Sequence, residues 1–331
     1  MRNLSLLVLA ILPLLSCNTA NEVVDVPEPR ITLKVFNLPP VPEGEGHYTL
    51  WATFFSFSKE AGTDSPLHEE GFINLGRFMV LPRDSFVYAL DGGPAQFRMP
   101  DTLDAQLLDD IKIAIQPEDD HGVATVFHEE EPGPGIVGGR FYGDAVVAHA
   151  DLTPTYNDAL GSNFSTARAY FSIMAPTSPA DSNSGMWFYN NGGPGLTGLP
   201  ELPEGWSYEA WVREDSRTSR RYYSYYSTGK FTRADTADAD GAGPGKGPGN
   251  GLNVPGQDFI TGTPATPNLW APNFSFFVTI EPVPDNSPNP FFLKILSNEP
   301  AVAIEDHVLS LPILNNVAGW TLPRARVAIL R

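Results

Sequence analysis

The sequence predicts an all-β protein, from its composition, from its lack of long helical periodicity and from a motif that occurs twice. Its 331 residues include 32 Pro and 30 Gly, both above average usage, while hydrophobic residues still make up 42%. Many turn-forming residues beside enough apolar residues for a core favour short strands and tight turns over disorder. The best helix candidate is short, at residues 103–109, so we expect little helix.

The motif that occurs twice is a proline-rich turn followed by an aromatic strand. Leu38–Gly44 precedes Tyr48–Trp51, and Leu199–Gly205 precedes Tyr208–Trp211. Within each turn, proline suits the second position of a β-turn and glycine suits the fourth. The next segment is β-prone, and strand alternation places its tyrosine and its tryptophan on opposite faces. We therefore expect one ring to anchor a core and the other to lie under the proline-rich loop.

Two further landmarks follow each copy of this motif in the same order. The first is a glycine, a basic residue and a phenylalanine, at Gly76–Phe78 and Gly229–Phe231. The second is an alternating apolar strand that ends in proline, at Ile111–Pro117 and Phe276–Pro282. Such alternation is typical of a half-buried antiparallel strand. The shared order of landmarks predicts a tandem repeat of a domain-sized unit.

The landmarks divide the chain into two similar parts followed by a tail. We expect residues 31–150 and 151–300 to form two tandem immunoglobulin-like antiparallel β-sandwiches. Residues 301–331 are fairly apolar, and we expect this C-terminal tail to pack on one of the domains. A chain of 331 residues is long enough for two domains with cores of ordinary size.

The N-terminal residues 1–16 have the pattern of a signal peptide. Arg2 supplies a positive start, Leu4–Leu15 is apolar, and Ser16 places a small residue before Cys17. About a dozen apolar residues are too few to span a bilayer, which needs roughly 20. We expect residues 17–30, which are polar and contain two prolines, to form a tether.

Cys17 is the only cysteine of the chain, so it has no internal disulfide partner. Its position directly after a small residue resembles the lipobox of bacterial lipoproteins. That resemblance implies cleavage before Cys17 and acyl chains such as palmitate at this residue, which anchor a protein to a membrane without a spanning helix. The alternative is an ordinary secretory signal in which Cys17 is incidental.

The formal net charge is −18, which is strongly acidic. An acidic surface repels nucleic acid and anionic lipid headgroups, so we expect no nucleic-acid partner.

One basic stretch interrupts this acidic sequence and is the best candidate for a binding surface. Arginines beside exposed tyrosines are typical of interfaces and of contacts with sugars or acidic polymers. The alternative is a twisted hairpin whose tyrosines stack on each other. The residues concerned are Arg217, Arg220, Arg221, Tyr222, Tyr223, Tyr225 and Tyr226.

A second candidate site is a loose calcium clasp made by Asp235, Asp238 and Asp240, which precede Gly241. An EF-hand would need a glutamate six residues after the glycine, where Gly247 stands, so that motif is excluded. The alternative is a solvated acidic loop.

The sequence contains none of the common hydrolase motifs. It has no Gly-x-Ser-x-Gly elbow, no pair of histidines with metalloprotease spacing and no cysteine nucleophile. Pairs of carboxylates suited to glycoside hydrolysis stay open, because spacing in sequence says little about them. We expect a protein that is not an enzyme.

Both copies of the motif resemble the extracytoplasmic C-terminal domain of anti-sigma-K-type regulators. The resemblance rests on Leu-Pro-x-x-Pro-x-Gly, Tyr-x-x-Trp, Gly-[Arg/Lys]-Phe, the run Asp238–Gly241 and the strands that end near Ile115 and Ile280. It implies a β-sandwich unit outside the cytoplasmic membrane. That family's helical sigma-binding module and its spanning helix have no counterpart here, which favours a sandwich held outside the cell by lipid.

These expectations combine into a non-catalytic lipoprotein of the cell envelope, at an outer membrane or the cell surface. It would bind or scaffold an envelope protein or a polysaccharide. One alternative is a sensory or regulatory ectodomain, related to anti-sigma factors, that acts with a membrane partner. A second alternative is a secreted hydrolase.

Overall fold

The structure is a computed structural model that describes residues 29–41, 46–59, 66–81, 85–100, 105–116, 132–144, 146–157, 159–216, 222–239, 253–259, 266–285, 287–299 and 313–330. Strands dominate these residues, which confirms the all-β prediction. Helical structure within them is limited to α1 (Ala318–Thr321) and two 3-10 turns, η1 (Ala105–Leu107) and η2 (Pro179–Asp181). No helix in the described residues combines the length and the apolarity that a membrane span requires.

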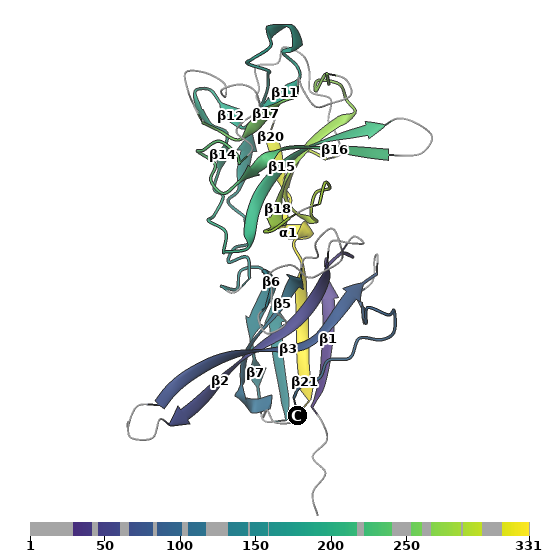
Figure 1. Cartoon of the computed structure of the whole chain (residues 1–331), viewed down its shortest axis with the longest axis vertical. Coiled ribbons are helices and arrows are strands. Elements are labelled where there is room, and N and C mark those ends of the chain that lie inside the picture. The colour runs from purple at the N-terminus through teal and green to yellow at the C-terminus, as the bar shows by residue number, and fades with distance from the viewer. Residues whose placement is uncertain are drawn as a thin grey trace, which may run out of the picture.

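Two antiparallel sheets form the lower part of the molecule in Figure 1, which we call the first body. The larger sheet has the order β4-β3-β2-β5-β6 and consists of β2 (His47–Lys59), β3 (Pro66–Val80), β4 (Val87–Tyr88), β5 (Leu108–Gln116) and β6 (Gly135–Arg140). The smaller sheet has the order β1-β21-β8-β7 and consists of β1 (Arg30–Phe36), β7 (Tyr142–Gly143), β8 (Val147–Leu152) and β21 (Arg324–Leu330).

The C-terminal strand β21 lies in the middle of this smaller sheet (Figure 1). It pairs along its whole length with β1 on one side and with β8 on the other. Its side chains alternate, so that Ala325, Val327 and Ile329 are buried. The sequence predicted that residues 301–331 form a tail that packs on a domain, and the pairing makes β21 a strand inside a sheet of the first body.

The second body, the upper part of the molecule in Figure 1, is built around a seven-stranded sheet with the order β14-β9-β20-β19-β18-β15-β16. Its strands are β9 (Arg168–Tyr170), β14 (Leu196–Thr197), β15 (Trp206–Ser216), β16 (Tyr222–Phe231), β18 (Phe274–Pro282), β19 (Leu293–Ser297) and β20 (Ile313–Asn316). Two small sheets complete this body: β10 (Ser172–Ile173), β11 (Gly185–Trp187) and β17 (Gly256–Asp258) form one, and β12 (Tyr189–Asn190) and β13 (Gly193–Pro194) form the other.

The repeated tyrosine makes the same contact in both bodies. The hydroxyl of Tyr48 donates a hydrogen bond of 2.7 Å to the carbonyl of Pro39, and that of Tyr208 donates one of 2.6 Å to the carbonyl of Pro200. Each tyrosine ring therefore lies in the core while its hydroxyl fixes the proline-rich loop. Burial raises the pKa of both hydroxyls, which keeps them protonated as donors.

The repeated glycine also has the same local geometry in each body. Gly76 and Gly229 have φ of 154° and 102°, in the region that favours glycine. Their N–H groups each donate 3.0 Å hydrogen bonds, to the Asn74 side chain and to the Ser227 side chain respectively. The strand register shifts opposite both positions, so each glycine marks a β-bulge.

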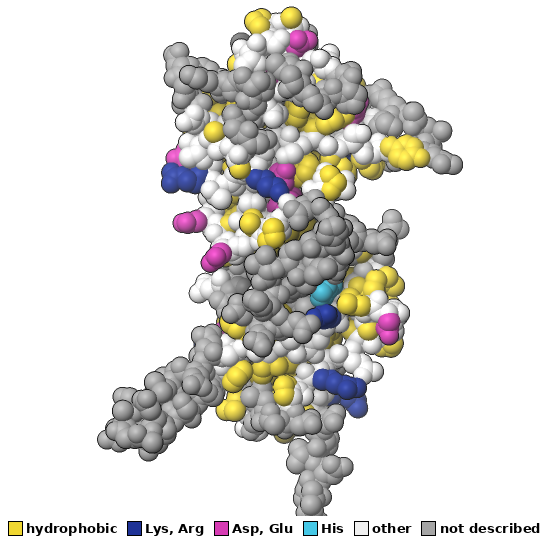
Figure 2. Space-filling view, in the orientation of Figure 1, with side chains coloured by type: hydrophobic (Ala, Val, Ile, Leu, Met, Phe, Trp, Pro, Cys, Tyr) yellow, Lys and Arg dark blue, Asp and Glu magenta, His cyan; other side chains and the backbone are white. Residues whose placement is uncertain are grey.

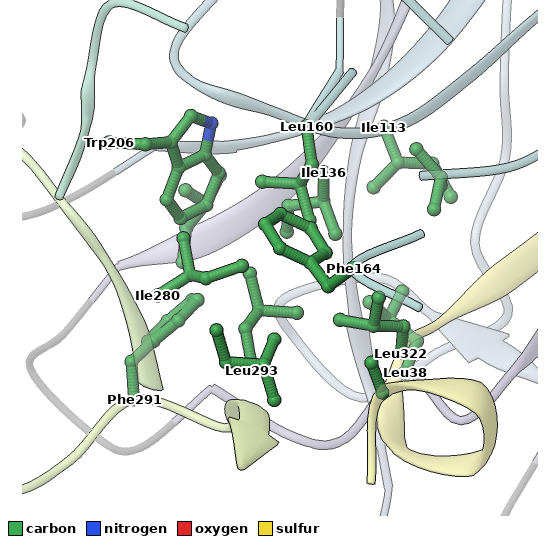
Figure 3. Packing of buried hydrophobic residues seen from close by; sticks show 14 of the residues in the cluster. Leu38, Ile113, Ile136, Leu160, Phe164, Trp206, Ile280, Phe291, Leu293 and Leu322 are labelled. Atoms are coloured by element: carbon green, nitrogen blue, oxygen red, sulfur yellow. The ribbon is translucent and has the colours of Figure 1, made fainter. Parts of the chain in front are cut away.

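The two bodies share one hydrophobic core. A single cluster of buried residues includes side chains from both, and Figure 3 shows Ile136 of the first body close to residues of the second such as Phe164. The indole of Trp206 donates a 3.2 Å hydrogen bond to the carbonyl of Gly135 across the junction. The rings of Tyr48 and Phe292 meet there edge-on, 6.2 Å apart. Apolar contact therefore joins the bodies in addition to the polypeptide chain.

Truncating the buried face of β21 should destabilise the protein. Ile329 is fully buried, so Ile329→Ala should lower the free energy of unfolding by about 2 to 5 kcal/mol, measured by urea denaturation. Leu330, the next residue, is 51% exposed and provides the matched control, because Leu330→Ala should change that energy by less than about 1 kcal/mol. Equal effects of the two substitutions would contradict the central placement of β21.

Candidate functional site

The side of the seven-stranded sheet opposite the main core cluster carries aromatic rings and cations, and Trp211 and Phe277 on that side are themselves buried. Tyr208, Ala210 and Val212 of β15 belong to the core cluster, so Trp211 between them points the other way. Trp211 pairs across the strands with Phe277 of β18, which is also outside that cluster. We call this set the aromatic–cation face and define it as Trp211, Arg213, Tyr223, Tyr225, Phe277, Lys294 and Glu299.

Ring contacts connect three strands of this face. Tyr225 of β16 lies edge-on to Trp211 and to Phe277, with ring centroids 6.5 and 6.2 Å apart and interplanar angles of 84° and 86°. Edge-to-face pairs of this kind contribute about 0.5 to 1.5 kcal/mol beyond the burial of area. The rings are therefore held in fixed orientations.

Two cations lie over rings of the same face and share one carboxylate. The Arg213 guanidinium is 4.6 Å from the ring centre of Tyr223, and the Lys294 ammonium is 4.0 Å from that of Phe277. Both cations form ion pairs with Glu299, and the Lys294 pair measures 2.5 Å. Since these groups are only partly exposed, their charges are fixed in place next to the rings.

The predicted tyrosines divide into exposed and packed residues. Tyr222 and Tyr223 are 58% and 41% exposed, near the end of the β15–β16 hairpin, where Figure 2 shows hydrophobic side chains at the surface. Tyr225 packs within the aromatic–cation face, while Tyr226 packs on the core side and donates a 2.9 Å hydrogen bond to Glu214. The three predicted arginines lie outside the described residues: Arg217, Arg220 and Arg221.

A cluster of carboxylates lies on the same side of the sheet, next to Trp211. Oxygens of Glu209, Glu281 and Asp285 all lie within 4.8 Å of one another, and this is the one such group of three metal-ligating side chains among the described residues. The Lys230 ammonium is 2.9 Å from Asp285 and 4.0 Å from Glu209. The cluster therefore contains its own counter-charge.

The carboxyl of Glu281 is completely buried at the end of β18. It accepts hydrogen bonds from the Thr279 hydroxyl and, at 3.0 and 3.1 Å, from the Phe291 N–H. Burial nevertheless raises the pKa of Glu281 to about 8, against the opposing effect of the Thr279 hydrogen bond and with the help of the charges of Asp285 and Glu209. Glu281 is therefore mostly protonated at neutral pH.

Lys230 stays charged within this cluster. Burial by itself would lower the pKa of its ammonium, but the hydrogen bond to Asp285 and the charges of Asp285, Glu209 and Glu281 outweigh burial and raise it. One ammonium and one proton thus balance most of the negative charge of the three carboxylates.

The first body has different side chains at the matching positions. Tyr48 pairs with Phe78 as Tyr208 pairs with Phe231, so the register places Thr49 at the position of Glu209. By the same register, Arg77 matches Lys230 and Gln116 matches Glu281. Among the described residues, the carboxylate cluster is therefore found in the second body.

The predicted calcium clasp is not assembled among the described residues. Asp235 forms an exposed ion pair with Arg233 at 2.9 Å, whereas Asp238 is buried and accepts a 2.8 Å hydrogen bond from the Gly256 N–H. Neither aspartate belongs to the carboxylate cluster. Asp240 lies outside the described residues.

Sequence reasoning missed the carboxylate cluster, although a signal was present. Glu209 and Glu281 each stand inside an otherwise apolar or aromatic strand, where a charged residue needs a partner. The third carboxylate, Asp285, and Lys230 come from other segments, so their meeting depends on strand pairing that the sequence does not show.

No model of a known protein family, no curated protein and no solved structure matches this chain. The resemblance to anti-sigma-K ectodomains therefore stays a prediction.

The raised pKa of Glu281 should make stability depend on pH. Folding favours the protonated form, so the stability of the wild type should fall as pH rises from about 4.5 to about 8, by at most about 1.4 kcal/mol per pH unit. Glu281→Gln keeps a hydrogen-bond acceptor and removes this titration, so its stability relative to the wild type should increase over that range. Urea unfolding from pH 5 to 8 measures the difference. Glu201→Gln, at an exposed position, is the control, and parallel pH profiles for wild type and Glu281→Gln would contradict the assignment.

Proposed function

We propose that this protein is a non-catalytic, lipid-anchored binding protein of the bacterial cell envelope. The observation that supports binding is the aromatic–cation face, which continues into the exposed Tyr222 and Tyr223 on the β15–β16 hairpin. The proposed anchor is acylated Cys17, which lies outside the described residues. Its partner is an envelope protein or a polysaccharide.

The geometry of this face suits recognition. Tyrosine offers a large contact area with only two side-chain torsions, so little conformational entropy is lost on binding. Tyr223 is additionally held under the Arg213 guanidinium, whose charge is tied to Glu299. Trp211 and Phe277 are buried, so they support the hairpin from beneath, and the contact surface itself is formed by the exposed rings of Tyr222 and Tyr223.

The carboxylate cluster supports a role without catalysis. A glycosidase must bring two carboxyl groups into contact with the sugar and with water. Glu209 is only 4% exposed and Glu281 is not exposed at all, so neither reaches a substrate. The cluster is better explained as a polar element that fixes the loop containing Phe291 and Asp285.

The residues that carry the resemblance to anti-sigma ectodomains have structural roles in this chain. Tyr48 and Tyr208 lock the proline loops, and Phe78 and Phe231 stack on them at 5.5 and 5.6 Å. These contacts favour a common β-sandwich architecture. They carry no information about signalling, so we place binding ahead of regulation.

Lipidation can be tested by labelling with an alkyne-tagged palmitate in a bacterial host. The wild-type protein should incorporate the label and sediment with membranes, whereas Cys17→Ser should do neither, because the thiol is the acceptor. Ser16→Ala keeps a small residue before the cysteine and should label like the wild type. Equal labelling of wild type and Cys17→Ser would refute the anchor.

Binding can be tested with the full chain immobilised and incubated with solubilised host envelopes. Tyr222→Ser combined with Tyr223→Ser should reduce the specifically captured component at least tenfold, because it removes the exposed rings of the hairpin. Phe86→Ser is the matched control, since Phe86 is an aromatic residue of the first body that is 70% exposed. Capture that does not change in the tyrosine variant would remove the aromatic–cation face as the binding surface.

A further inference from the structure

A second candidate site lies where the two bodies meet, around the short helix α1 (Figure 1). Two adjoining hollows of about 560 and 500 Å³ share Gly319 and Arg324 as lining residues. One is lined chiefly by the ends of β1, β8 and β21, and the other by the start of β9, the end of β20 and α1. We call these two adjoining hollows together the junction groove.

The junction groove gathers positive charge on an otherwise acidic protein. Arg168, Arg324 and Arg326 line it, and all three are exposed. Arg326 forms a 2.7 Å ion pair with Asp151, while the described residues include no carboxylate partner for Arg168 or Arg324. Three guanidinium groups thus line the hollows against one carboxylate, that of Asp151, among the described lining residues, and the Arg168 guanidinium also donates to the carbonyls of Ser165 and Ala167.

An exposed tryptophan stands beside these arginines on an ordered backbone. Trp320 is 68% exposed, although large aromatic side chains are usually covered. Its carbonyl accepts a 3.0 Å hydrogen bond from the Asn37 side chain, and its N–H donates one of 3.1 Å to Val317. These hydrogen bonds hold the backbone of Trp320, and its exposed indole offers a flat apolar surface to a ligand.

Neutral hydrogen-bonding groups complete the lining. Asn163 and Asn315 line the hollow next to Trp320, and Asn37 lines the other. Phe36, which is 45% exposed, gives the second hollow an aromatic surface of its own. Each hollow thus combines one exposed ring, at least one amide group and arginine, and the hollow with Phe36 also contains Asp151.

We propose that the junction groove binds a linear acidic polysaccharide whose sugar rings carry carboxylates. The apolar face of a sugar ring stacks on tryptophan, its hydroxyl groups pair with amides, and a carboxylate matches the paired N–H donors of arginine. The two adjoining hollows offer this combination twice along the groove, as a chain of sugar rings requires. Nucleic acid fits less well, because its denser negative charge is repelled more strongly by a chain of net charge −18.

This site is separate from the aromatic–cation face. Its residues come from β1, β8, β9, β20, α1 and β21, whereas the face is built on β15, β16, β18 and β19 with Glu299. The two proposals can therefore fail independently.

Calorimetry with the full-length protein in detergent tests the junction groove. The probe is a galacturonate hexamer, and its methyl-esterified form is a neutral probe of the same shape. The acidic hexamer should bind at 1:1 stoichiometry, at least tenfold more tightly than the ester, and more weakly as salt is raised. Absence of binding, or equal binding of both probes, would overturn the proposal.

Variants locate the site. Trp320→Ala and Arg324→Gln should each weaken binding of the hexamer at least tenfold, because each removes a group that touches the ligand. Arg98→Gln is the control for loss of an exposed arginine, and unfolding curves check that every variant is folded. Tyr222→Ser with Tyr223→Ser should leave hexamer binding unchanged. Unchanged binding in Trp320→Ala and Arg324→Gln, or equal affinity for inorganic polyphosphate, would refute an acidic-sugar groove.

Discussion

The insertion of β21 between β1 and β8 is the constraint on which the rest of the structure depends. In the second body, β20 likewise lies between two earlier strands, β9 and β19. In the first body, β1 and β8 are both paired to β21, and neither pairs with the other. The last residues of the chain are therefore needed to complete the sheet that the first strand begins. Because β21 follows α1 closely, the same pairing places α1 at the junction of the two bodies.

The two bodies show how one backbone scaffold carries different side chains. Three features recur in both bodies with nearly equal distances: the hydrogen bond from the tyrosine to the proline-rich loop, the glycine at a β-bulge, and the phenylalanine that stacks on the tyrosine. They recur because they hold a turn to a sheet. Side chains on the opposite side of each large sheet do not hold a turn, so they are free to differ between the two bodies. There Thr49 and Gln116 match Glu209 and Glu281, so one body has neutral groups where the other has a buried carboxylate cluster. Only the second body has Tyr222 and Tyr223 on its hairpin.

The sequence predicted local structure well wherever the physical reason is local. Proline and glycine at defined turn positions, and apolar residues at every second position, were enough for the all-β class. The expected division of roles between the two repeated rings was wrong, because each tyrosine both enters the core and holds the proline-rich loop, while the tryptophan indoles donate to Thr49 and Thr279. The short helix expected at residues 103–109 is a 3-10 turn followed by strand from Leu108, because pairing with β2 outweighs weak helical propensity. Neither β21 nor the junction groove was predictable, since each depends on contacts between residues far apart in sequence, such as Arg168 and Trp320.

The pairing of β1 with β21 also determines how the protein bears mechanical load. Arg30 lies opposite Leu330 at one end of the ladder, and Phe36 lies opposite Arg324 at the other. The N-terminal segment enters at Arg30, while the second body connects through Arg324. A pull between that segment and the second body therefore acts on opposite ends of the two strands. The seven residue pairs are then sheared together and cannot open one after another like a zipper. A chain held at its N-terminal tether and loaded through the second body would resist extension at its first strand.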